Sequence, residues 1–86
     1  GESEPNNWQA QMEWAASIGG ELPDRVESAL LFATLRDEFK EAWYWTREQH
    51  AACGAYAWMQ HFGYGGQGYY RKSLDYRARA VRRESI

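Results

Sequence analysis

The sequence predicts one small α+β domain in which two N-terminal helices are followed by a mainly antiparallel sheet. The chain has 86 residues, which is too short for two separate hydrophobic cores. Apolar residues recur at helical spacing as far as Phe39 and alternate at strand spacing from Trp43 onward. Aromatic residues make 16% of the chain, and such large rings can fill the core of a small domain.

The first helix is expected to begin after Asn6 or Asn7, either of which can act as its N-cap, and to run to about Ile18. Gly19 and Gly20 follow it, and glycine readily takes the left-handed conformation that ends helices. Three residues at helical spacing form its apolar face: Trp8, Met12 and Ala15.

The second helix is expected from about Arg25 to Phe39. Asp24 precedes it as N-cap, and Glu27 lies three residues later, which is the capping-box spacing. The helix carries two apolar stripes, one of Leu31, Phe32, Leu35 and Phe39 and one of Val26, Ala29, Leu30 and Ala33. Two stripes predict a helix that is covered on two sides.

Four strands are expected after the helices: 43–45, 55–62, 69–71 and 76–82. The glycine-rich segment 63–68 should connect the second and third as a hairpin. In the second strand Trp58 shares a face with Tyr56 and Phe62, which predicts that Trp58 is an anchor of the core.

The order of these motifs resembles the Lcl C-terminal-domain family, a set of bacterial and phage proteins with a C-type-lectin-like fold. The resemblance rests on Leu22-Pro23-Asp24-Arg25 at the start of the second helix, on Trp43 and Trp45 in the central strand, and on the closing Arg79-Ala80-Val81-Arg82. It covers roughly residues 8–83.

The resemblance implies a non-enzymatic binding scaffold, often encoded by phages or prophages, and it carries no binding residue over to this chain. The sequence departs from the family pattern after the Trp-containing strand. Segment 46–50 reads Thr-Arg-Glu-Gln-His where the family usually has small polar residues.

Composition favours a single domain, 1–86, in a reducing, cytoplasmic compartment. The lone cysteine, Cys53, cannot form an internal disulfide, and no apolar run is long enough to span a membrane. The N-terminus shows no secretory signal, and Gly1 suggests a processed end or a cloning remnant. We therefore expect residues 1–5 to be flexible or a cloning remnant and residues 84–86 to fray.

Charge is distributed unevenly along the chain. Residues 1–70 hold four basic and ten acidic side chains, a balance of −6, whereas residues 71–86 have a balance of +4. The simplest interpretation is a basic C-terminal strand that lies against acidic helices. An acidic surface could also imitate nucleic acid and block a basic groove.

No catalytic site, metal or cofactor is expected. His50, Cys53 and His61 offer at most three ligands without a CxxC pair, so we interpret them as a small semi-buried thiol and two polar surface groups. Glu4-Pro5-Asn6 matches a calcium-binding tripeptide of sugar-binding lectins but lies before the first helix instead of before a late strand. No carboxylate is paired with an apolar pocket that would tune it for acid–base catalysis.

The residues most suggestive of function surround the hairpin, and we predict that they bind a partner: Tyr64, Tyr69, Tyr70 and Arg71, with Arg47. Tyrosine and arginine beside glycine are typical of protein-recognition surfaces. Single-stranded nucleic acid is a less favoured ligand, and the rings could instead merely cover the sheet. Because the first two hairpin tyrosines after the turn are adjacent in one strand, at most one should point outward.

Function is therefore expected to be stoichiometric binding of a host protein or complex, with no membrane partner. An inhibitor of a host defence complex, such as an anti-CRISPR protein, fits a short acidic domain. The alternative is a receptor- or glycan-binding module of a phage particle or adhesin. The sequence leaves open whether the chain is a monomer or a homodimer.

Overall fold

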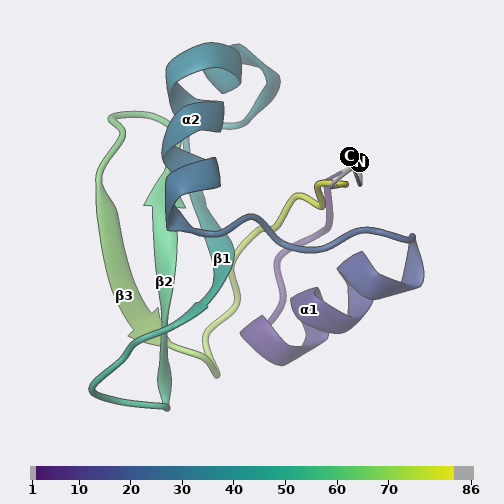
Figure 1. Ribbon diagram of the computed structural model, residues 1–86, viewed down its shortest axis with the longest axis vertical. Coiled ribbons are helices and arrows are strands. Elements are labelled where there is room, and N and C mark those ends of the chain that lie inside the picture. The colour runs from purple at the N-terminus through teal and green to yellow at the C-terminus, as the bar shows by residue number, and fades with distance from the viewer. Residues whose placement is uncertain (1, 83–86) are drawn as a thin grey trace.

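The computed structural model describes residues 2–82 and shows a small α+β domain, as predicted (Figure 1). Two helices and one short 3₁₀ helix precede a three-stranded antiparallel sheet. In chain order the elements are α1 (Trp8–Ser17), α2 (Arg25–Leu35), η1 (Arg36–Glu38), β1 (Trp43–Gln49), β2 (Tyr56–His61) and β3 (Gln67–Arg71).

Both helices begin with the caps that the sequence predicts. The side chain of Asn7 accepts a hydrogen bond from the Ala10 amide at the start of α1. Asp24 and Glu27 form a reciprocal capping box at the start of α2. Gly19 follows α1 with a φ of 78°, which is the left-handed conformation expected of a glycine at a helix end.

The second helix is shorter than expected. α2 ends at Leu35, and η1 replaces the last turn that would have reached Phe39. Phe39 then adopts an extended backbone, so that its ring stacks on Phe62 with centroids 3.9 Å apart. Stacking of this ring on the end of the sheet replaces a further helical turn.

The sheet has the strand order β1-β2-β3. Trp45 pairs with Met59 across β1 and β2, and Trp58 pairs with Tyr69 across β2 and β3. β1 is longer than the predicted 43–45, with an irregularity between Trp45 and Gln49. Pairing partners lie on the same face, so this register fixes which side chains share each side of the sheet.

The main hydrophobic cluster lies on the face of the sheet that carries Trp45, Ala57 and Met59, here called the core face, while Tyr44 is buried on the opposite face. Trp8 and Ala15 of α1 pack into the same cluster as these three fully buried residues. The cluster also includes Leu22 and Ala78. Large side chains from α1 and β1 therefore meet small or flexible ones from β2.

The prediction that Trp58 anchors the core is wrong. Trp58 is only partly buried and lies on the opposite face of β2 from Met59, which has no exposed surface. We call this second side the α2 face, because Arg25 at the start of α2 lies over the Trp58 ring.

Segment 76–82 does not form the ladder strand that its alternation predicts. Isolated bridges join it to several segments instead: Tyr76 to Asn6, Arg77 to Tyr44, Arg79 to Glu2 and Val81 to Glu21. It runs between β1 and α1 (Figure 1).

Residues near the N-terminus belong to this arrangement. We expected residues 1–5 to be flexible or a cloning remnant, yet the Ser3 amide donates to the Ala78 carbonyl at 3.1 Å. The predicted fraying of residues 84–86 lies outside the described residues. Two arginines of the basic segment contact acidic residues: the Arg79 guanidinium donates to the backbone carbonyl of Glu38 in η1 at 2.5 Å, and the Arg77 guanidinium lies 3.8 Å from the Glu2 carboxylate.

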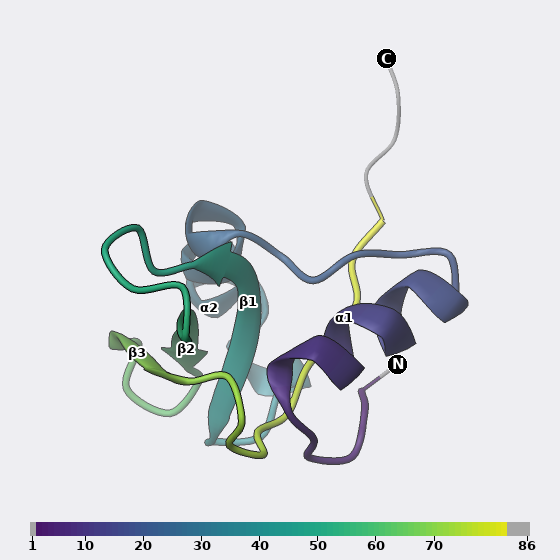
Figure 2. The same cartoon turned by 90° about the horizontal axis from the view of Figure 1, so that it is seen from below.

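α1 and α2 lie on opposite sides of β1, as Figure 2 shows from below. Phe32 of α2 meets Phe62 edge to face, with ring centroids 6.2 Å apart. Within residues 2–82, however, no element covers the second stripe of α2, so the prediction of a helix covered on two sides is wrong.

Candidate protein-binding surface

The outward side of α2 carries four exposed apolar side chains, here called the α2 stripe: Val26, Ala29, Leu30 and Ala33. Val26 is 77% exposed and Leu30 is 62% exposed. They lie one helical turn apart, so both point to the same side of the helix. Exposed apolar patches of this kind mark interaction sites more often than single exposed residues do.

A shallow groove of about 430 Å³ runs along the inner border of the α2 stripe. Its walls come from α2, from all three strands and from the β2–β3 turn. The lining residues are Arg25, Val26, Ala29, Glu48, Gln60, Gly65 and Gln67.

The polar side chains of the groove are engaged with one another. The amide of Gln67 donates to the Arg25 carbonyl at 2.8 Å and to the Gln60 side chain at 2.9 Å. The Arg25 guanidinium donates a hydrogen bond to the side-chain oxygen of Gln67 at 3.0 Å. The Glu48 carboxylate accepts a hydrogen bond from the backbone amide of Arg25, also at 3.0 Å. These hydrogen bonds hold α2 against the sheet. The polar side chains of the groove therefore have a structural role.

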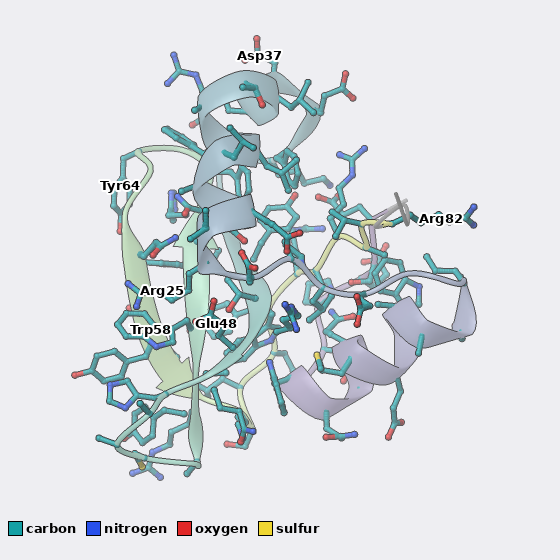
Figure 3. The ribbon with its side chains drawn as sticks, viewed as in Figure 1. Arg25, Asp37, Glu48, Trp58, Tyr64 and Arg82 are labelled. Atoms are coloured by element: carbon teal, nitrogen blue, oxygen red, sulfur yellow. The ribbon has the colours of Figure 1, made fainter. Side chains whose placement is uncertain are left out.

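An aromatic cluster continues the α2 face beyond the helix. Arg25 lies 3.6 Å from the centroid of the Trp58 ring, and the two side chains are adjacent in Figure 3. Tyr69 meets Trp58 edge to face at 5.2 Å, and the His50 ring lies 4.2 Å from that of Tyr69. Tyr56, the first residue of β2, completes the cluster.

The hairpin tyrosines do not form one surface. Tyr69 and Tyr70 lie on opposite faces of β3, as alternation predicts, but both are exposed, at 49% and 37%. The expectation that at most one points outward is therefore wrong. Tyr70 packs beside Trp43, with ring centroids 5.5 Å apart, on the core face of β3.

Tyr64 belongs to the same side as Tyr70. Its ring stacks on His61 at 4.3 Å and meets Trp43 edge to face at 6.1 Å, yet it remains 67% exposed. Tyr64 is labelled at the hairpin turn in Figure 3.

The two predicted arginines have different surroundings. Arg47 extends from β1 toward the start of α2, where it lies 3.7 Å from the Asp24 carboxylate. Arg71 is exposed and pairs in register with Tyr56 at the end of β3. The five predicted residues thus divide among the start of α2, the edge of the α2 face and the opposite side of the hairpin.

Two exposed residues of α2, Val26 and Leu30, were missed as binding residues. The sequence does show their stripe, but periodicity reports only that a helix has an apolar side and not whether another element covers it.

The three residues considered for a metal site do not converge. Cys53 is exposed, contrary to the semi-buried thiol expected, and lies with His50 in the loop before β2. His61 lies at the other end of β2, where its Nδ1 accepts from the Gly63 amide at 3.0 Å. Both histidines are partly buried in aromatic stacks instead of free at the surface. Among residues 2–82 no group of three histidine, cysteine or acidic side chains could hold a metal ion.

Comparison of the chain with protein-family models, with curated proteins and with solved structures found no match. Within residues 2–82, none of the helices has the length and apolar character needed to cross a membrane.

Proposed function

We propose that this domain is a non-enzymatic protein-binding module and that the α2 stripe is its contact surface. The observation that carries the proposal is the exposure of Val26 and Leu30 on a helix whose other side already packs on the sheet. Desolvation of such apolar side chains is a main source of affinity at protein interfaces. The groove beside them adds a concave border that a protruding side chain of a partner can fill.

Protein is favoured over glycan as the ligand by the surroundings of Trp58. Sugar rings stack on an open aromatic face, but the Arg25 guanidinium lies over this ring at 3.6 Å. The polar groups of the groove bond to one another, whereas a glycan site presents donors and acceptors for hydroxyl groups.

The resemblance of the sequence to the Lcl C-terminal-domain family supports a finer proposal. On that resemblance the α+β arrangement is a C-type-lectin-like fold, and the chain is phage- or prophage-encoded. The module then acts inside the host cell by stoichiometric contact with a host protein complex, as an inhibitor of a defence system such as CRISPR would.

The test compares single substitutions on exposed apolar residues. Leu30→Glu places a charge in the α2 stripe, and Leu74→Glu places the same charge on a leucine that is 42% exposed outside that stripe. Both variants should keep the far-ultraviolet circular dichroism of the parent. Each is expressed in bacteria whose defence system blocks phage plating.

The parent domain and Leu74→Glu should restore plating, and Leu30→Glu should reduce the restored plating at least about tenfold, because burying an unpaired charge costs several kcal/mol. Quantitative pull-down of the defence complex with the same three baits should follow the same order. Equal activity of parent and Leu30→Glu would refute the α2 stripe as the contact surface. Failure of the parent to restore plating against a panel of defence systems would refute the inhibitor proposal.

A further inference from the structure

The two outer edges of the sheet differ. At β1 the backbone is engaged, because the Trp45 amide donates to the Arg77 carbonyl and the Arg47 amide donates to the Pro23 carbonyl, both at 2.9 Å. At β3 no strand of the described chain pairs on the outer side. Figure 1 shows β3 at the free side of the sheet, away from α1.

The hydrogen bonds to β2 determine which groups of β3 face outward. The His61 amide donates to the Gly66 carbonyl and the Lys72 amide donates to the Ala55 carbonyl, both at 2.9 Å. Because inward and outward residues alternate in an antiparallel strand, Gly68 and Tyr70 also turn their backbone groups toward β2. The amides and carbonyls of the alternate residues, Gln67, Tyr69 and Arg71, then point away from the sheet.

A row of unpaired backbone amides and carbonyls of this kind is a template on which another strand can pair. Proteins usually block it with proline, a bulge, an inward-pointing charge or a covering segment. β3 contains no proline and pairs with β2 in continuous register from Gln67 to Arg71.

We propose that a second copy of this chain pairs with β3, antiparallel, about a two-fold axis at Tyr69. In this register Tyr69 lies opposite Tyr69 of the second copy, and Gln67 lies opposite Arg71. Each of these outward pairs exchanges two backbone hydrogen bonds. The result is one continuous sheet across the dimer.

The side chains of β3 complement themselves in this register. Opposed tyrosines form a favourable cross-strand aromatic pair, and the arginine faces a neutral amide. On the other side of the sheet, Tyr70 of one copy lies beside Gly68 of the other, where its ring would meet the Trp43 and Tyr70 rings that border Gly68. A two-fold interface uses the same patch on both copies, so each of these contacts occurs in both directions.

Other two-fold registers are less favourable. An axis at Arg71 places two arginines opposite each other, and like charges in that position are destabilising. An axis at Gln67 places Arg71 opposite Gly63, which lies in the turn. An axis at Gly68 or Tyr70 leaves an outward residue of each copy opposite a residue outside β3. Only the axis at Tyr69 pairs every outward residue of β3 with another residue of β3.

The first test measures self-association of the parent by analytical ultracentrifugation over a wide concentration range. The parent should pass from monomer to dimer. Tyr69→Pro removes an outward amide and leaves the bonds to β2 intact, and the preceding glycine tolerates proline. We expect this variant to weaken dimerisation at least about tenfold, because the central pair of hydrogen bonds is lost.

Tyr69→Lys provides a second variant that changes no backbone group. Two lysines would face each other at the axis, so dimerisation should weaken at low salt and recover partly at high salt. If Tyr69→Pro unfolds, as judged by circular dichroism, the dimerisation of Tyr69→Lys becomes the test of the proposal. A parent that stays monomeric at all concentrations, or a dimer unaffected by Tyr69→Lys, would overturn the proposal.

The register itself can be tested by cross-linking in a Cys53→Ser background, which removes the exposed thiol. Directly opposed residues of this type have Cα atoms about 5.5 Å apart, within the range that a disulfide spans. Tyr69→Cys should therefore give a covalent dimer under mild oxidation. Arg71→Cys is the matched control and should not, because the two copies of that residue lie several residues apart along the strands. Cross-linking by Tyr70→Cys or Arg71→Cys in place of Tyr69→Cys would disprove this register.

Discussion

The guanidinium of Arg25 lies 3.6 Å from the centroid of the Trp58 ring and joins the first turn of α2 to the α2 face of β2. The same side chain donates to Gln67 on β3, so one residue connects a helix to two strands. A planar cation over an aromatic ring contributes about 0.5–2 kcal/mol, depending on how far the pair is removed from water. This contact holds α2 in the position that exposes the α2 stripe.

The first prediction follows from that contact. Arg25→Ala should lower the free energy of unfolding by about 1–2 kcal/mol, because it removes the stacking and the bond to Gln67. Arg25→Lys should recover little of this loss, since an ammonium group lacks the planar shape. Urea unfolding followed by tryptophan fluorescence measures both. Arg36→Ala is the control, because Arg36 is exposed and its guanidinium lies 5.3 Å from the Phe32 ring.

The second prediction ranks two neighbouring residues of β2. Met59→Ala should cost about 2–5 kcal/mol, because the side chain is fully buried in the core cluster. Trp58→Ala should cost less, about 1–2 kcal/mol, although the residue is larger, because its ring is partly exposed. Thermal melts of the two variants give the order directly. A lower melting temperature for Trp58→Ala than for Met59→Ala would contradict the assignment of the core face.

Local signals were enough to predict much of the fold. Asn7, Asp24 and Glu27 cap their helices through bonds within three residues of sequence, and such bonds form wherever the helix packs. Alternation in β2 likewise separates Trp58 from Met59 correctly.

Alternation does not tell which face is inside. The larger rings of Tyr56 and Trp58 favour their own face, but Trp8 of α1 and Trp45 of β1 already fill the core face. Only small or flexible neighbours such as Ala57 and Met59 fit beside them. That choice depends on where α1 docks, which is a long-range contact.

The candidate surface was difficult to predict for the same reason. Whether Leu30 is covered depends on what lies beyond α2, and segment 76–82, which could have formed another strand of the sheet, instead lies between β1 and α1. The hairpin tyrosines were visible as a group in the sequence, but the pleat of β3 sends them to opposite faces.

The third prediction concerns the start of α2. Asp24→Ala should cost about 0.5–2 kcal/mol, because the Glu27 amide loses its acceptor. Asp24→Ser keeps a capping oxygen and should recover most of the loss. Urea unfolding at low and high salt checks the cause. A cost that disappears at high salt would instead assign the effect to the ion pair with Arg47, which is partly exposed and 3.7 Å long.

The last prediction compares two glycines that differ in their surroundings. Gly65 has a φ of +85°, and a Cβ there would lie 2.6 Å from the Phe32 ring. Gly65→Ala should therefore cost about 1–3 kcal/mol, since it adds backbone strain and displaces the ring that packs α2 on the hairpin turn. Gly54→Ala is the matched control, because a Cβ there meets no atom within 4 Å. It should leave stability unchanged or raise it slightly by restricting the unfolded chain. Chemical denaturation of both variants measures the difference, and equal midpoints would mean that the turn does not contact α2 through Phe32.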